Sequence, residues 1–479
     1  MSLTKATFAM IDGATVNVLD FGATGDGVTD DADSIIAALN SLGANGGTLF
    51  FPAGTYMVGK VIPIKRGVHY LGESPYSTVV KATAASWDNI FGYGYPSSAQ
   101  AAQERDFIFE NLTIDGNKAN RTENQLSLQG TGSGIFIDGE TVTSSSGGTA
   151  ICSVHNEPVT FIGLEPGSIV GTFNVGNVVT GQTSGATLTI ASKAPDDAWQ
   201  ISMRCQSAQR FRITNCIFRN SFYTALSVYN NCVEGTIDNC QFYDNNKAGT
   251  VLSSPYVIFI ESYGRNLMIF NNIIDNNPLG SSIVVRGGIL SAIKIIGNSI
   301  TNSGNYGIEI QSSVQGGNGV ASDIHVIGNR LYLAPNGGEQ LTIIGQAAPA
   351  VLRNIVVSGN TFDTGAVGVG IRGNVDTISV VNNAFKEMTT APIIVAGILG
   401  AGSPSKYNLF GNVTDSTDAN FQYINASING TTWIAGSGSP EGVVFASVGA
   451  LYSRTNGGAG TSFYVKESGT NTNTGWVAK

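Results

Sequence analysis

Three short segments, VIFIES at 257–262, SIVVRG at 282–287 and GIEIQS at 307–312, share one pattern of residues. Their second and fourth residues are Ile or Val, whereas the third and fifth residues vary. Side chains of a β-strand alternate between its two faces. One face of each segment is therefore apolar and the other is mixed, which predicts strands buried on one face only.

The same pattern recurs along the chain. Further copies are GIFIDG (134–139), ALSVYN (225–230), LTIIGQ (341–346), GVGIRG (368–373) and PIIVAG (392–397). A second repeated feature is a small polar residue, two positions before a large apolar one, at Cys216, Cys240, Asn272, Asn298, Asn329, Asn360 and Asn383. These positions are 23 to 32 residues apart. A repeat of this length, in which each turn buries its apolar face against the next, predicts an all-β, right-handed single-stranded parallel β-helix.

The polar slot is expected at a sharp turn. Asn tolerates a left-handed φ there and can pair with the Asn of the turns above and below. Cys216 and Cys240 are expected to be small buried residues of the same stack, without a reactive role.

The repeat also sets the predicted domain boundaries. Residues 1–44 form an N-terminal cap with a short helix that Asp30 and Asp31 begin and Gly43 ends. Residues 45–139 and 206–415 form the β-helix, and residues 140–205 form an inserted small β module. Residues 416–479 form a C-terminal β region with a hairpin of strands near 450–453 and 462–466, which is too small to be stable alone and is expected to serve trimerisation.

Composition excludes several classes of function. The chain of 479 residues has a formal net charge of −9, whereas nucleic-acid binding requires a basic surface. It has no apolar run long enough for a membrane helix and no signal-peptide pattern at its start. Five cysteines and three histidines favour neither a disulfide framework nor a zinc site. No cofactor and no metal are expected.

The outward residues of the repeated strands are the candidates for chemistry. The fifth position gives Asp138, Tyr229, Glu261, Arg286, Gln311, Gly345, Arg372 and Ala396, and the third position includes Phe136, Ser227, Phe259, Val284, Glu309 and Ile343. Strands stack about 4.8 Å apart, so Asp138 and Glu261, two rungs apart, should be about 9–10 Å apart. Hydrolysis of a glycosidic bond needs one acid and one carboxylate base at such a separation.

We therefore expect Glu261, Asp138 and Glu309 to be catalytic, with Glu261 as first choice. Substrate binding is expected from Tyr229, Phe136, Phe259, Arg286, Gln311 and Arg372, because aromatic rings cover the apolar faces of sugars and polar groups bind their hydroxyls. Arg286, between Glu261 and Glu309, could orient an acidic sugar or keep a neighbouring acid ionised.

A rival outward column follows the polar slot. It consists of Asp115, Arg219, Tyr243, Asp275, Thr301, Tyr332, Asp363 and Lys386. This column also offers acids and aromatic residues, so the site could lie on that face or between subunits.

The N-terminal sequence VNVLDFGATGDGVTDD (16–31), followed by GGT (46–48) and FPAGTY (51–56), resembles the start of pectate-lyase-like β-helix proteins. The segment NVGNVVTGQTSGA (174–186) and the tail GALYSRT (449–455), YVKESG (464–469) and TGWV (474–477) resemble bacteriophage tailspikes. The resemblance implies a homotrimeric tailspike of the virion tail that binds and cleaves a bacterial capsular or surface polysaccharide outside the bacterial cell. It also implies attachment to the phage tail or baseplate through a domain that is not part of this sequence.

Three functions stay open at this point. An endo-glycoside hydrolase releases only reducing ends. A polysaccharide lyase requires a uronic acid and releases an unsaturated sugar that absorbs ultraviolet light. A non-catalytic adhesin binds glycan and releases nothing.

Overall fold

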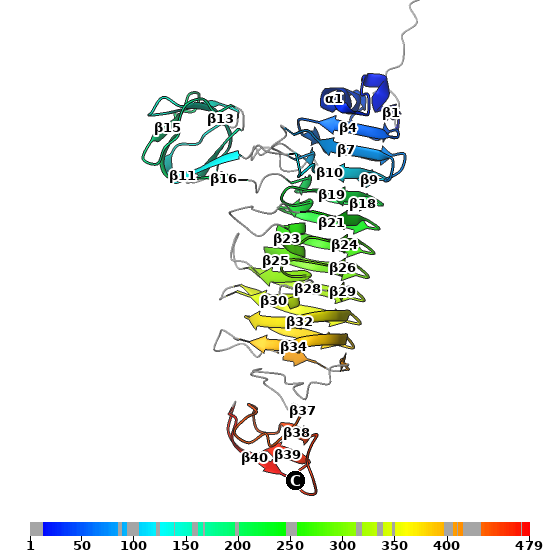
Figure 1. The fold of residues 1–479 in the computed structure, drawn as a ribbon, viewed down its shortest axis with the longest axis vertical. Coiled ribbons are helices and arrows are strands. Elements are labelled where there is room, and N and C mark those ends of the chain that lie inside the picture. The colour runs from blue at the N-terminus through cyan, green and yellow to red at the C-terminus, as the bar shows by residue number, and fades with distance from the viewer. Residues whose placement is uncertain are drawn as a thin grey trace, which may run out of the picture. The chain divides into compact units, whose positions relative to one another are not determined.

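The computed structural model consists mainly of β-strands that stack in rungs (Figure 1). It describes residues 13–84, 89–92, 105–120, 125–137, 139–155, 161–165, 168–196, 201–245, 256–312, 319–332, 339–346, 350–396, 406–409, 411–414, 433–470 and 472–479. The chain divides into two compact units. Unit 1 contains Met1–Val228 and Cys240–Val257, and unit 2 contains Tyr229–Asn239 and Ile258–Lys479.

The rungs of unit 1 are joined in parallel ladders. One ladder is β1–β3–β6–β9–β18, another is β2–β4–β7–β10–β19–β22, and a third is β5–β8–β17. Their bounds are β1 Thr15–Asn17, β2 Asp26–Asp30, β3 Gly47–Phe51, β4 Gly54–Val58, β5 Ile62–Pro63, β6 Val68–Gly72, β7 Thr78–Ala82, β8 Phe91–Gly92, β9 Ile108–Glu110, β10 Thr113–Asp115, β17 Met203–Gln206, β18 Gln209–Thr214, β19 Ile217–Arg219 and β22 Gln241–Tyr243. The strand β20 (Leu226–Tyr229) reaches the boundary of the unit.

Aromatic rings fill much of the core of unit 1. Tyr70 stacks on Phe109 at 4.2 Å between ring centroids, and Phe218 stacks on Phe242 at 4.8 Å. Because adjacent rungs place equivalent residues directly above one another, rings at the same position of successive strands meet face to face.

The N-terminal cap contains a 3-10 turn, η2 (Val18–Phe21), and the helix α1 (Ala32–Ser41). Asp30 accepts a hydrogen bond from the Ala32 N–H at 3.1 Å, as expected of a cap. The Asp31 carboxylate instead accepts from the N–H groups of Thr24 and Gly25. The expected stop at Gly43 is wrong, because Leu42 ends the helix in an extended conformation and is buried.

The inserted module is a closed antiparallel barrel with the strand order β11-β14-β13-β12-β15-β16. The bounds are β11 Gln125–Ser133, β12 Thr141–Ser144, β13 Thr149–His155, β14 Phe161–Leu164, β15 Val178–Gly181 and β16 Thr187–Asp196. The predicted boundaries of 140 and 205 are therefore displaced, since the barrel strands run from Gln125 to Asp196.

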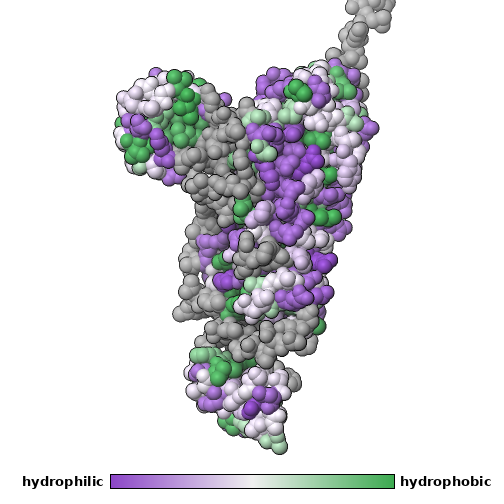
Figure 2. Space-filling view, in the orientation of Figure 1, coloured by the Kyte–Doolittle hydropathy of each residue, from purple (hydrophilic) through white to green (hydrophobic). Residues whose placement is uncertain are grey.

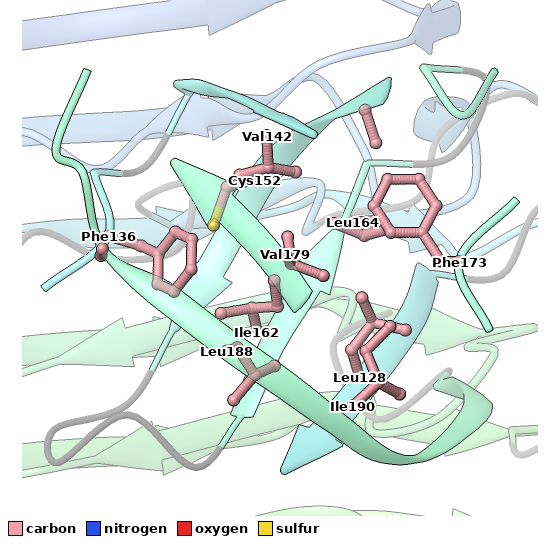
Figure 3. Packing of buried hydrophobic residues seen from close by; sticks show 12 residues of the cluster. Leu128, Phe136, Val142, Cys152, Ile162, Leu164, Phe173, Val179, Leu188 and Ile190 are labelled. Atoms are coloured by element: carbon pink, nitrogen blue, oxygen red, sulfur yellow. The ribbon is translucent and has the colours of Figure 1, made fainter. Parts of the chain in front are cut away.

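The segment 134–139 is not a rung of the β-helix, contrary to the prediction. Phe136 is only 1 % exposed and lies in the barrel core, where Figure 3 shows its ring near Cys152. Its neighbours Ile135 and Ile137 are 55 % and 48 % exposed. The alternation of the pattern is present, but the faces are exchanged, because three consecutive apolar residues do not specify which of them is buried.

Unit 2 repeats the ladder arrangement with longer strands. One ladder is β24–β26–β29–β32–β34–β36, a second is β25–β27–β30–β32–β34, and a third is β21–β23 and β25–β28–β31–β33–β35. Their bounds are β21 Cys232–Asp238, β23 Tyr256–Phe270, β24 Ile273–Asp275, β25 Ser281–Ile296, β26 Ser299–Thr301, β27 Ile308–Ser312, β28 Val320–Ile327, β29 Arg330–Tyr332, β30 Glu339–Gly345, β31 Val351–Ser358, β32 Thr361–Gly373, β33 Thr377–Val381, β34 Ala384–Ala396, β35 Lys406–Asn408 and β36 Val413–Thr414.

The polar slots of unit 2 form a hydrogen-bonded asparagine stack. Asn298 donates from its backbone N–H and its side-chain Nδ2 to Asn329 Oδ1, both at 2.9 Å, and Asn329 donates in the same way to Asn360. The predicted pairing of these residues is confirmed. The predicted left-handed φ is displaced by one residue, because it is the residue before each slot, such as Asn271 or Gly297, that has a positive φ.

The C-terminal region forms a four-stranded sheet, β37-β38-β39-β40, with bounds Trp433–Gly436, Leu451–Arg454, Phe463–Lys466 and Trp476–Ala478. The predicted hairpin is present, with Leu451 opposite Val465 and Tyr452 opposite Tyr464. Tyr452, Tyr464 and Trp476 form its own small core.

Candidate functional site

The outward column of unit 2 follows the register of the ladder that contains β25, β27, β30 and β32. Val284 lies opposite Glu309, and Arg286 lies opposite Gln311, as the repeat predicts. The predicted alignment of 341–346 is wrong by one residue, since Glu309 pairs with Thr342 and Gln311 with Ile344. Leu341 and Ile343 thereby take the buried positions, which a Thr would fill poorly.

Glu309 lies on this column but is almost fully enclosed. Its side chain is 4 % exposed, and Arg286 Nη2 donates to Glu309 Oε1 at 2.5 Å. Ser281 Oγ donates to the other carboxylate oxygen at 3.3 Å. The Arg286 guanidinium also lies 5.9 Å from the centroid of the Phe259 ring. Phe259, Arg286 and Glu309, predicted separately, therefore form one contact network.

A second enclosed carboxylate lies on the next rung. Glu339 begins β30, its side chain is 6 % exposed, and both of its oxygens accept hydrogen bonds from the Arg372 guanidinium. Arg372 Nη1 also donates to Thr342 Oγ1 at 3.3 Å. Arg372 was predicted to bind substrate, and its side chain is 40 % exposed although it holds Glu339.

Gly370 makes room for the Glu339 carboxylate. Gly370 lies opposite Thr342 in the outward column, and a Cβ atom at this position would collide with both carboxylate oxygens of Glu339. The carboxylate therefore lies across the outward face of the backbone at Gly370.

Tyr306 is electrostatically coupled to the two glutamates. Burial raises the pKa of the Tyr306 hydroxyl, and the charges of Glu339 and Glu309 raise it further, while Arg372 acts in the opposite direction. The hydroxyl is protonated at neutral pH, since the ordinary tyrosine pKa is already about 10. Glu309, Glu339, Tyr306, Arg286 and Arg372 are called the glutamate site below.

Several predicted residues lie outside this site. Asp138 is outside the described residues, and the neighbouring N–H groups of Ile137 and Gly139 donate to the Glu140 carboxylate and the Cys152 carbonyl. Phe136 cannot bind substrate as predicted, since it is in the barrel core.

Glu261 remains on the outward face of β23 and is partly exposed. Its backbone carbonyl accepts from the Asn230 N–H at 3.2 Å, which places Tyr229 opposite it. Tyr229, Glu261 and Gln311 thus flank the glutamate site along one face of unit 2, and their side chains are all partly exposed.

Sequence reasoning missed Glu339, Tyr306 and Ser281. By the alternation rule all three share the parity of the buried column, because each lies an even number of residues from Ile283, Ile308 or Leu341. Ser281 and Glu339 are the first residues of β25 and β30, and Tyr306 lies two residues before β27, where the alternation no longer fixes the side-chain direction. One signal in the sequence could have revealed Glu339. Gly370 has no side chain at an outward position where the neighbouring strands carry Glu309 and Thr342, which leaves space for another residue.

In the described part of the chain, no helix is long and apolar enough to span a membrane, and no group of three or more His, Cys, Asp or Glu residues could hold a metal ion. The carboxylates of Asp26 and Asp31 accept hydrogen bonds from backbone N–H groups of their own loop.

Two family models match this sequence. Residues 15–250 match rhamnogalacturonase A/epimerase, pectate lyase-like, and residues 199–385 match the right-handed β-helix region. The fold is a right-handed parallel β-helix. The chain thus carries pectate-lyase-like and β-helix domains, in agreement with the predicted fold class.

Among curated relatives, alginate lyase 7 of Azotobacter vinelandii is 40 % identical over 119 residues, which are 23 % of this chain and 13 % of that protein. Mannuronan C5-epimerase AlgE4 of the same organism is 39 % identical over 112 residues, which are 22 % of this chain and 20 % of that protein. The matched part is thus a fifth or less of each relative. These relatives are named as polysaccharide-modifying enzymes.

Among solved structures, a double mutant of the tailspike protein of E. coli bacteriophage HK620, in complex with a pentasaccharide, superposes with a TM-score of 0.55 at 12 % identity. The match covers 84 % of this chain and 64 % of the tailspike. PfbA, a surface adhesin of Streptococcus pneumoniae, gives a TM-score of 0.52 at 14 % identity over 97 % of this chain and 98 % of PfbA. These likenesses establish the fold.

Proposed function

We propose that this chain is the polysaccharide-cleaving part of a bacteriophage tailspike. In this proposal it hydrolyses glycosidic bonds within a bacterial capsular or surface polysaccharide. The observation that carries the proposal is the glutamate site, where two enclosed carboxylates on neighbouring rungs are held by arginines on the outward face. The tailspike fold and the relatives named for alginate and mannuronan support a polysaccharide as substrate.

The two glutamates differ in how they are held, which suggests their roles. Glu339 accepts from two nitrogens of Arg372 in a bidentate pair, and in this proposal it is the base that activates water. Glu309 accepts one guanidinium bond and one hydroxyl bond, and in this proposal it is the general acid. Tyr306 donates a hydrogen bond to the substrate or to water.

The state of Tyr306 favours hydrolysis over β-elimination by a tyrosinate. A tyrosine that removes the proton next to a uronate carboxyl must lose its own proton, so its pKa should be lowered. Here burial and two carboxylates raise the pKa of Tyr306. A lyase is nevertheless the second candidate, because alginate lyase 7 is among the relatives and two arginines at the site could bind a uronate.

The test uses sodium alginate, polygalacturonate and purified E. coli surface polysaccharides. Hydrolysis by the wild-type protein is expected to release reducing ends without ultraviolet-absorbing unsaturated ends. Glu309→Gln and Glu339→Gln should each lower the rate by about 10²–10⁴-fold, because each removes one member of the proposed acid–base pair. Glu234→Gln, at an exposed position of unit 2, is the matched control.

Release of unsaturated, ultraviolet-absorbing ends would show that the protein is a lyase and not a hydrolase. Retention of the polysaccharide without any released ends would leave only a glycan-binding adhesin. Full activity of both glutamine variants would remove the glutamate site from the mechanism.

The proposal includes a homotrimer. In the C-terminal region Val443, Phe445 and Val448 are 61 %, 49 % and 56 % exposed, whereas Ala446 is buried in the small core. One side of this segment thus presents apolar side chains that a second copy could cover. Light scattering at micromolar concentration should give three times the chain mass, and a monomer would contradict it.

A further inference from the structure

Unit 1 presents a different polar ladder on the face that follows the polar slot. Lys81 lies opposite Asp115, Asp115 opposite Arg219, and Arg219 opposite Tyr243, on four successive strands. Arg219 Nε donates to Asp115 Oδ2 at 2.8 Å, and Arg219 Nη1 donates to the Tyr243 hydroxyl at 3.4 Å. The ladder therefore holds the Tyr243 ring in a fixed position beside a guanidinium.

A loop lies over the same face and ends in an exposed ring. Thr113 Oγ1 donates to the carbonyl of Pro75, and Gln241 Nε2 donates to the Tyr76 hydroxyl at 3.2 Å. Tyr76 is nevertheless 76 % exposed. Gln241 and Tyr243 are two residues apart on β22 and point the same way. Two tyrosines are thus positioned on one surface by hydrogen bonds to their hydroxyls.

The donors between the two rings are partly unused. Arg219 has five N–H groups, and within the described residues only two of them have a partner in these hydrogen bonds. Its side chain is 33 % exposed, so the remaining donors can reach a ligand. Figure 2 shows hydrophilic residues gathered over the rungs of this unit.

We infer that Tyr76, Gln241, Arg219 and Tyr243 form a second polysaccharide-binding surface, which holds the polymer without cleaving it. The rings of Tyr76, which is exposed, and Tyr243, which is partly exposed, can cover the C–H faces of sugar rings, while amide and guanidinium donors bind hydroxyl or carboxylate oxygens. Catalysis is not expected here, because both oxygens of the Asp115 carboxylate already accept hydrogen bonds, which come from Arg219, Asn220 and the Asn117 N–H. The polymer is the one named in the proposed function, on which this inference rests.

The test measures binding apart from cleavage. Affinity electrophoresis is run through gels that contain sodium alginate, polygalacturonate or E. coli surface polysaccharides, with Glu309→Gln as the parent. Adding Tyr76→Ala should weaken the retardation about 10-fold, whereas Tyr76→Phe, which keeps the ring, should retain most of it. Val28→Ala, at an 86 % exposed residue of the N-terminal cap, should leave retardation unchanged.

Equal retardation of the Tyr76→Ala variant and the parent would overturn the inference, as would a parent that none of the polymers retards. Loss of the oligomeric state in light scattering would show a subunit contact instead, which also overturns it. A polymer that retards the parent but is not cleaved by the wild-type protein would refute the proposed hydrolase and leave this surface standing.

Discussion

Unit 1 and unit 2 each bury carboxylates against arginines of a neighbouring strand, but the hydrogen-bond donors around those carboxylates differ. Asp115 has a short side chain and accepts from a guanidinium, a side-chain amide and a backbone N–H. Glu309 and Glu339 have longer side chains, and both raise the pKa of one tyrosine. A carboxylate whose acceptors are filled by rigid neighbours serves the fold. Two carboxylates held by partly exposed arginines, close to a shared hydroxyl, can serve a reaction.

The largest expected difference between the two units is in activity. Glu339→Gln should lower polysaccharide cleavage by about 10³-fold, because it removes the proposed base. Asp115→Asn should leave the rate within a few-fold, since its carboxylate binds only the protein. Release of reducing ends from the same polymer measures both. A comparable loss of rate for Asp115→Asn would contradict the proposal that only the carboxylates of unit 2 take part in cleavage.

A large loss of stability is expected on removal of the Asp115 carboxylate. Asp115→Ala should reduce the free energy of unfolding by about 3 kcal/mol, because it leaves Arg219 without its carboxylate in a mostly buried position. Asp33→Ala is the control. It breaks the pair with Lys60, in which the two side chains are 82 % and 55 % exposed, and should cost less than about 1 kcal/mol. Urea unfolding followed by circular dichroism compares them, and equal losses would contradict the assignment.

Gly370→Ala tests whether cleavage depends on the position of the Glu339 carboxylate. The new methyl group must displace the Glu339 carboxylate, so the cleavage rate should fall about 10- to 100-fold through kcat while the urea midpoint changes little. Gly458→Ala is the control, since no atom lies within 4 Å of a Cβ placed there. An unchanged rate in Gly370→Ala would mean that the position of Glu339 does not matter.

Tyr306→Phe should have a smaller effect, about a 10-fold loss of rate, because it removes one hydrogen-bond donor and no charge. The raised pKa means that the wild-type hydroxyl keeps its proton up to pH 10, so the loss should be the same from pH 6 to pH 9. A loss that grows with rising pH in this range would instead indicate a tyrosinate base.

The smallest effect is expected at Asp26 in the N-terminal cap. The N–H groups of Thr29 and Val28 lower its pKa to about 2, below the unfolded value of about 3.9. Because the pKa of Asp26 is lower in the folded state, its ionised carboxylate stabilises the fold at pH values above the unfolded pKa. This contribution is lost as the pH falls from about 4 to about 2. The difference in urea midpoint between wild type and Asp26→Asn should therefore shrink between pH 5 and pH 2.5. A difference that stays constant would contradict this.

The fold was predictable because its determinants are periodic. Buried Ile and Val at alternate positions specify strands, and Asn at a fixed spacing specifies the turn stack, since each Asn needs a partner on the next rung. Errors arose where periodicity is ambiguous. Phe136 is one of three consecutive apolar residues, any of which could face the core. The segment Leu341–Ile344 fits two alignments, and the one observed gives the buried apolar positions to Leu341 and Ile343 and not to Thr342.

The site was predictable only in part. Glu309, Arg286, Phe259 and Arg372 lie at outward positions that the repeat identifies. Glu339 and Tyr306 do not, because the direction of a side chain at the beginning of a strand depends on the turn before it and on the space left by other rungs. That space is created by Gly370, some thirty residues later in the chain, and only three-dimensional contact reveals it.

The barrel has a consequence for how this chain can change. It interrupts the sequence between β10 and β17, yet Asp115 and Arg219, on either side of the interruption, pair as if they were consecutive. Closing a longer connection between two strands costs little additional free energy, roughly 0.6 kcal/mol of lost chain entropy for each doubling of its length. A whole domain can therefore be exchanged at this position while the neighbouring rungs keep their register.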